Sequence, residues 1–143
     1  LEGMGKKLYE IFEHTADLGL RVRAASREEL FVDAAYGLFS VVVANPDQVT
    51  PLLTKELRVE GQELDYLLFD WLIELLYTLE TEKFLLAQCE VHFDDQGLSA
   101  TCRGEPLDVD RHLPDHEVKA ITYHGLKVEE TPVGWLAEVI VDI

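Results

Sequence analysis

Residues 63–83 constrain the fold more than any other stretch, because leucines recur there at the spacing of one helical face. The side chains that follow the i, i+3, i+4 pattern are Leu64, Leu67, Leu68, Trp71, Leu75, Leu76 and Leu79. A helix with so broad an apolar face cannot remain in water, so it is predicted to be the central helix of the core. Such a leucine stripe is far more often core than a cofactor-binding surface.

A second helix is predicted over residues 26–46. Ser26 and Glu29 have the spacing of a capping box, in which each side chain bonds a backbone N–H at the helix start. Leu30, Ala34 and Leu38 then recur every four residues, which indicates one apolar face. The Asn45-Pro46 pair is a helix stop, so the helix is expected to end there.

Most of the other segments have strand character. Strands are predicted over residues 6–14, 18–25, 53–61, 118–130 and 134–143, and residues 84–104 are predicted to form a hairpin. Helices that do not alternate regularly with strands favour an α+β fold, with two helices packed on a mostly antiparallel β-sheet. The expected unit is a single domain over residues 4–143, and residues 1–3, which precede the only methionine, are interpreted as a cloning remnant.

The hairpin prediction also places the two cysteines. If Asp95-Gln96 is the loop, Asp94 pairs with Gly97 and Cys89 lies opposite Cys102 on the apolar face. Buried thiols on such a face behave as small hydrophobic residues. A cross-strand disulfide is the less favoured alternative, and the cysteine spacing matches no zinc motif. A reduced, cytoplasmic protein is therefore expected.

The net charge excludes several classes of function. Acidic residues outnumber basic ones 28 to 12, for a net charge of −16. Binding to DNA or RNA requires clustered Lys and Arg, so no direct nucleic-acid binding is expected from this chain alone. No apolar run is long enough to predict a transmembrane helix, so no membrane association is expected. An acidic surface suits cations or a basic patch on a partner protein, although the charge can also serve solubility alone.

Two acidic groups end the last predicted strand: the side chain of Asp142 and the terminal carboxylate of Ile143. If this strand pairs next to the first strand, they meet Asp17 from the turn after residue 14 at one end of the sheet. Like charges at such close range repel one another, and a bound cation removes that repulsion. Oxygen ligands suit Ca²⁺ or Mg²⁺ better than Zn²⁺. The plain alternative is that Asp17 forms a turn and Asp142 is solvated.

Three blocks of the sequence resemble the archease family: "FEHTADLGLRVRA" (12–24), "EVKAITYHGLKV" (117–128) and "GWLAEVIVDI" (134–143). The similarity extends over essentially the whole chain from about Lys7. Archeases are small acidic α+β proteins that assist the RtcB-type RNA ligase of tRNA splicing and RNA repair. The resemblance implies a non-enzymatic activator that promotes guanylylation of the ligase and its multiple turnover, and that broadens its use of nucleotides.

The resemblance also implies site residues. It assigns a divalent metal site to Asp17, Asp142 and the Ile143 carboxylate, and assisting roles to the matched positions His14, Lys119 and His124. Ca²⁺ is favoured over Mg²⁺, since a site built from a turn and a chain end has irregular geometry. One departure is that Glu13 stands where the family turn often has Asp, which preserves the carboxylate.

Two other functions remain open at this point. One is a stand-alone metal-dependent hydrolase, although no nucleophile–base pair with an oxyanion site is apparent in the sequence. The other is a chaperone-like interaction protein whose terminal acids are incidental.

Overall fold

The computed structural model describes residues 8–14 and 17–143, and for residues 13 and 14 it describes the backbone alone. Residues 1–3, interpreted above as a cloning remnant, lie outside the described residues. The elements in chain order are β1 (Tyr9–His14), β2 (Asp17–Ala24), α2 (Arg27–Val42), the 3₁₀ helix η1 (Pro46–Gln48), β3 (Leu53–Glu60), α3 (Leu64–Glu82), β4 (Phe84–Asp94), β5 (Gly97–Pro106), β6 (Ala120–Thr131) and β7 (Gly134–Asp142). In the described part of the chain, no helix is long and apolar enough to cross a membrane.

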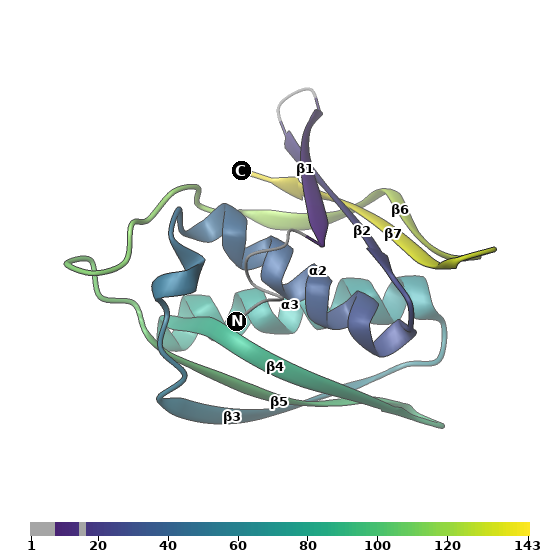
Figure 1. Cartoon of the computed structure of the whole chain (residues 1–143), viewed down its shortest axis with the longest axis horizontal. Coiled ribbons are helices and arrows are strands. Elements are labelled where there is room, and N and C mark those ends of the chain that lie inside the picture. The colour runs from purple at the N-terminus through teal and green to yellow at the C-terminus, as the bar shows by residue number, and fades with distance from the viewer. Residues whose placement is uncertain (1–7, 15–16) are drawn as a thin grey trace.

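The fold is α+β, as predicted, but the strands form two sheets instead of one. Helices α2 and α3 lie between a four-stranded and a three-stranded sheet (Figure 1). The reason is visible on α3, where the buried residues Leu67 and Leu76 are nine positions apart and so face opposite sides of the helix. A helix that is apolar on two sides requires cover on both.

The four-stranded sheet has the order β1-β2-β7-β6, and every pair of neighbours is antiparallel. The last strand therefore pairs with β2 and not with β1, which corrects the arrangement considered from the sequence. Because β1 and β2 form a hairpin, β2 has one free edge, and β7 occupies it. The end of β7 nevertheless lies beside Asp17, because Asp17 is the first residue of β2.

The three-stranded sheet has the order β3-β5-β4, and its hairpin follows the predicted register. Asp94 pairs with Gly97 and Cys89 with Cys102, and both cysteines are buried free thiols. The hydrogen bond with Cys102, together with burial, raises the pKa of the Cys89 thiol well above its ordinary value. A thiol in that state is protonated and unreactive at neutral pH.

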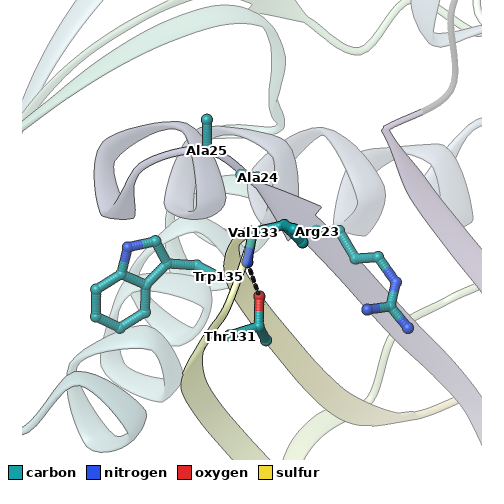
Figure 2. Close-up of a pocket in the computed structure, with 6 residues that line it drawn as sticks. All are labelled: Arg23, Ala24, Ala25, Thr131, Val133 and Trp135. Carbon is teal, nitrogen blue, oxygen red and sulfur yellow. Dashed lines mark hydrogen bonds between the residues drawn. The ribbon is translucent and has the colours of Figure 1, made fainter.

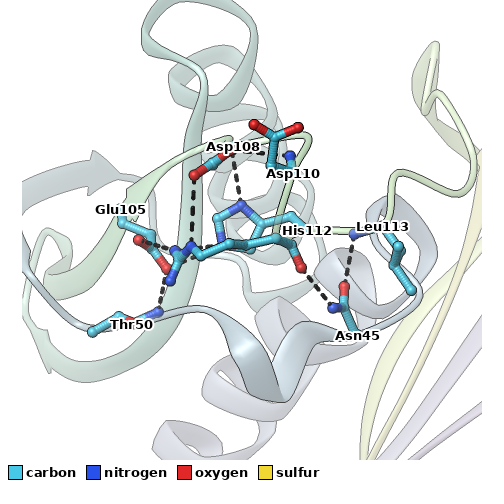
Figure 3. A network of polar contacts seen from close by, with 8 residues as sticks. Asn45, Thr50, Glu105, Asp108, Asp110, His112 and Leu113 are labelled. Carbon is cyan, nitrogen blue, oxygen red and sulfur yellow. Dashed lines mark hydrogen bonds and ion pairs between the residues drawn. The ribbon is translucent and has the colours of Figure 1, made fainter.

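The segment after β5 is a polar loop by sequence, but it folds back onto the core through a buried ionic network (Figure 3). Glu105 is 5% exposed and His112 is fully buried. The backbone N–H of Asp108 donates to His112 Nδ1 at 2.9 Å, so the ring hydrogen lies on Nε2, which is 3.0 Å from Glu105 Oε2. Arg111 forms an ion pair with the other oxygen of Glu105, and the Thr50 N–H donates to Glu105 Oε2 at 2.6 Å.

Asn45 attaches the same loop to the end of α2. Its side-chain amide donates to the Arg111 carbonyl at 3.0 Å, and its side-chain oxygen accepts from the Leu113 N–H at 2.8 Å. A backbone bridge between Val43 and Pro114 follows. These contacts order the segment that leads into β6.

Asp33 is a buried carboxyl on α2, and its environment disfavours the charged form. Burial, followed by repulsion from Glu29, raises the pKa of Asp33 from 3.8 to about 6. Because the folded-state pKa lies above the unfolded one, the folded protein loses stability as pH rises from about 4 through about 6. At neutral pH the ionised carboxylate is therefore a destabilising group.

Asp33→Asn is expected to stabilise the protein at pH 7–8 by up to about 3 kcal/mol, because it removes the cost of ionising a buried carboxyl. The gain should disappear at pH 4, where the wild-type carboxyl is already protonated in the fold. Urea denaturation of both proteins at several pH values measures this difference. Asp70→Asn, at an exposed position on α3, is the control and should change little. A gain of equal size at pH 4 and pH 8 would contradict the explanation.

Candidate metal-binding corner of the sheet

Asp17 and Asp142 are directly opposite each other across the β2–β7 ladder. Side chains alternate along a strand, and Leu20, Val22, Val139 and Val141 are buried in the core, so the two aspartates project from the outer face of the sheet. Both residues are half-buried. The structure thus brings the two predicted side-chain ligands, 125 positions apart in sequence, to one place.

Two carboxylates in this position repel each other. Directly opposed residues in an antiparallel pair have Cβ atoms roughly 4.5–5.5 Å apart, and like charges there are destabilising. A divalent cation between them would convert that repulsion into attraction, and the donors are the oxygen atoms that Ca²⁺ and Mg²⁺ prefer. The chemistry of the donor set therefore fits the predicted metal.

Ile143 follows Asp142 directly, and its side chain packs against the hydrophobic core. This packing holds the last residue, and with it the carboxylate, at the same corner. Among the residues that the structure describes, no three His, Cys, Asp or Glu side chains gather into a group that could hold a metal ion. The predicted site consequently depends on the Ile143 carboxylate as its third acidic group.

An apolar row separates the carboxylates from the rest of the outer face. The Phe12 ring lies across Gly19, where an added Cβ would be 2.1 Å from the ring, and Gly19 pairs with the buried Ile140. This contact was not predicted from the sequence, although a glycine inside a strand is a signal of close approach. Beyond it, Arg21 Nε donates to Glu138 Oε2 at 2.6 Å. The carboxylate pair thus has an apolar neighbour on the side that faces the rest of the sheet.

The three residues to which the resemblance assigns assisting roles, His14, Lys119 and His124, differ in their position relative to the carboxylates. His14 pairs with Asp17 through the β1–β2 register, but its side chain lies outside the described residues. The backbone N–H of Lys119 donates to the Asp142 carbonyl at 2.7 Å, which places Lys119 at the same corner. His124 is exposed and lies further along β6, within the stretch where the register with β7 shifts.

A shallow pocket of about 250 Å³ lies at the other end of β2 and β7 (Figure 2). It is lined by Arg23, Ala24, Ala25, Thr131, Val133 and Trp135. Ala24 pairs with Trp135 seven residues from the Asp17–Asp142 pair, which is roughly 24 Å along a strand. Arg23 and Trp135 point to opposite sides in Figure 2, so they do not form a stacking platform. The pocket is separate from the candidate site.

Comparison with known proteins gives the same assignment over almost the whole chain. The profile of the Archease protein family (MTH1598/TM1083) matches residues 9–143. Protein archease of Pyrococcus abyssi is 42% identical over 142 residues, which cover 96% of this chain and 99% of that protein. Protein archease of Methanopyrus kandleri is 41% identical over 139 residues, which cover 94% and 99%.

Two solved structures are also similar. The solution structure of protein 1598 from Methanobacterium thermoautotrophicum has a TM-score of 0.85 at 31% identity, and the match covers 96% of this chain and all of that one. The crystal structure of a Thermotoga maritima archease, described as a possible chaperone, has a TM-score of 0.60 at 18% identity, with 94% and 96% covered. The second likeness concerns the fold alone. On the profile match and these full-length identities, the chain belongs to the archease family.

Proposed function

We propose that this protein is an accessory factor that activates an RtcB-type RNA ligase in tRNA splicing and RNA repair. The proposed action is faster guanylylation of the ligase, more turnovers and a broader choice of nucleotide, in the cytoplasm. The observation that carries the proposal is the Asp17–Asp142 pair at the corner of the sheet, in a chain whose family membership follows from its sequence.

Two groups of the described residues that could act in catalysis are closed to substrate. Glu105 and His112 have the geometry of a carboxylate–histidine dyad, but His112 is fully buried and both of its ring nitrogens are engaged. The Cys89 thiol is buried, and its raised pKa keeps it protonated. A substrate can reach neither group, so the chemistry is proposed to occur in the partner's active site.

Asp17, Asp142 and the Ile143 carboxylate would hold a divalent cation, with Ca²⁺ preferred to Mg²⁺ because Ca²⁺ tolerates irregular oxygen cages. When bound, the cation supplies positive charge that favours anionic phosphate groups. Lys119 can add a second positive charge at the same corner, since its backbone is bonded to Asp142. The exposed charge of Lys119 is thus available to a nucleotide in a partner's active site.

Adding this protein to a cognate RtcB-type ligase at a ratio of about one to ten is expected to raise the number of ligations per ligase above one. The reason is that an activator that is released after each guanylylation can serve many ligase molecules. Gel-based ligation and capture of the guanylylated ligase measure the effect. Unchanged turnover and guanylylation over a range of ratios would refute the proposal.

The two other functions predict outcomes that differ from those expected of an activator. A hydrolase would cleave phosphate esters in the presence of Mg²⁺ without any ligase. A chaperone-like protein would raise the yield of soluble ligase but leave the guanylylation rate of folded ligase unchanged. These measurements therefore distinguish the three candidate functions with one preparation of each protein.

A further inference from the structure

The exposed aromatic side chains gather on and beside helix α3. Among the residues that the structure describes, the large aromatic side chains with high exposure are Tyr66 (52%), Tyr77 (60%) and Tyr123 (58%). Tyr66 and Tyr77 belong to α3, and Tyr123 of β6 packs against α3. Exposed apolar side chains that are scattered singly need no explanation, but a contiguous group of this kind marks an interaction surface.

The α3 residues of this group follow a helical seam. Tyr66, Asp70, Ile73, Tyr77 and Glu80 are exposed at the spacing i, i+4, i+7, i+11 and i+14. At 100° per residue these five side chains lie within about 40° of one line along the helix. The face opposite is buried in the core, so α3 carries an outward line of aromatic, aliphatic and acidic side chains that the core does not use. We call the five residues together with Tyr123 the aromatic stripe.

The aromatic stripe is extended sideways by an irregularity in β6. Between Thr122 and Lys127 the register with β7 shifts, and Gly125 adopts a φ of 70°. Within this irregular stretch the Tyr123 ring stacks on Phe69, with centroids 3.9 Å apart and planes 14° apart. The same ring meets Tyr66 edge-on at 5.8 Å. The irregular backbone of this stretch thus places Tyr123 beside α3, and the aromatic side chains form a broad surface that is exposed to solvent.

The charged side chains that α3 itself contributes are of one sign, and the cation Lys55 forms an ion pair with Glu82 at the C-terminal end of the helix. Every charged side chain of α3 and its N-cap is acidic: Glu63, Asp65, Asp70, Glu74, Glu80 and Glu82. Tyrosine rings and carboxylates side by side are the groups that bind a guanidinium, through cation–π contact and ion pairing. A second copy of a chain with net charge −16 would be repelled, and nucleic acid would be repelled as well.

We propose that the aromatic stripe is a docking surface for a basic, arginine-bearing segment of a partner protein. The inference depends on the proposed function only for the partner's identity, which would then be the RNA ligase. Tyr123 is three residues from Ala120, the β6 partner of Asp142, which is roughly 10 Å along the strand. The Tyr123 end of the stripe is therefore close to the carboxylate corner along β6, on the helix-facing side of the sheet whose outer face carries Asp17 and Asp142.

A peptide titration tests the surface without any ligase. The probe is a helical peptide with arginines at i and i+4, with a lysine version of the same peptide for comparison. The ring signals of Tyr66 and Tyr123 in NMR spectra are expected to shift saturably, less with the lysine peptide, and not at high salt because exposed charges are then screened. Ring signals that stay in place at a tenfold excess of the arginine peptide would overturn the inference.

A binding assay then tests the surface against the ligase. The double substitution Tyr66→Ala/Tyr123→Ala is expected to weaken binding at least about tenfold, as the loss of interface aromatic residues commonly does. Asp70→Lys/Glu80→Lys alters exposed positions alone and should weaken binding comparably without affecting the fold. Val133→Ala, at a position 93% exposed in the β6–β7 turn, is the control and should bind as wild type.

The outcomes separate the two proposals. If wild type fails to bind the ligase, the proposed function is lost, and the peptide titration still decides on the surface. If wild type binds the ligase and both double variants bind equally well, the docking surface is wrong and the proposed function stands. A dimer in sedimentation analysis that dissociates on Tyr66→Ala/Tyr123→Ala would assign the stripe to a second copy and overturn the inference.

Discussion

Replacing Asp17 or Asp142 by Asn, or appending residues after Ile143, is expected to lower the affinity for Ca²⁺ by more than about 100-fold and to abolish ligase activation. Each change removes one of three negative groups from a small site. Loss of a group that merely orients a metal ligand already costs roughly 10–100-fold in affinity, and loss of a ligand should cost more. Calorimetric titration of Ca²⁺ and Mg²⁺ into wild type and the three variants measures the affinity independently of the ligase.

The same variants give an opposite result for stability in the absence of metal. Because Asp17 and Asp142 oppose each other as like charges, either Asn substitution should leave the metal-free protein as stable as wild type or more stable by about 0.2–1 kcal/mol. A variant that merely unfolds would show the reverse. Asp110→Asn, at an exposed position in the loop between β5 and β6, is the control and should retain the wild-type affinity for Ca²⁺. If the extended form binds metal and activates the ligase like wild type, the Ile143 carboxylate is no ligand.

Glu105→Ala is expected to destabilise the protein by about 3 kcal/mol, near the lower end of the range for breaking a buried ion pair. The substitution leaves His112 fully buried with an unpaired Nε2–H and removes the acceptor of the Thr50 N–H. Arg111 is half exposed and can turn to water, which limits the loss. Urea denaturation measures the change. Glu90→Ala, which removes an exposed ion pair with Arg103, should cost less than about 1 kcal/mol.

The Glu105 network also predicts a dependence on pH. Burial acts to raise the pKa of Glu105, but the Thr50 N–H, His112 and Arg111 together outweigh burial, so the pKa lies below its ordinary value of 4.5. A depressed folded-state pKa stabilises the fold above the unfolded pKa, and this contribution is lost as pH falls below about 4.5. The gap between wild type and Glu105→Ala should therefore narrow in acid. A gap that is constant from pH 7 to pH 3 would contradict this explanation.

Much of the fold followed from local patterns. Three of its features involve residues that are close in sequence or lie in one hairpin. They are the Ser26 cap, whose hydroxyl accepts from the Glu29 N–H at 3.1 Å, the leucine pattern of α3, and the Cys89–Cys102 pairing. Helical and strand periodicity encodes such contacts directly. The partition into two sheets was not predicted, because it depends on which strands cover each side of α2 and α3.

The sequence predicted that the acidic groups of the candidate site would meet at one end of the sheet, but it did not predict which strand β7 joins. Charge, order and the three sequence blocks singled out Asp17, Asp142 and Ile143, whereas nothing local indicated that β7 would insert beside β2 and oppose the two aspartates. The position of His124 was not predictable either, because it lies within the stretch of β6 where the register with β7 shifts. Pairing across 125 positions is a property of the assembled sheet.

The sequence by itself determined the elements, the acidic character, the buried thiols and the family. These properties depend on side-chain type and on periodicities of two or 3.6 residues, which are present in any chain before it folds. The tertiary structure alone decided that Glu105 and His112 would be buried together, that Tyr123 would stack on Phe69, and that two carboxylates would share one corner. Each of these contacts joins residues from separate elements, and it forms only because packing of the two sheets against α2 and α3 outweighs the local cost of burying polar groups and bending a strand.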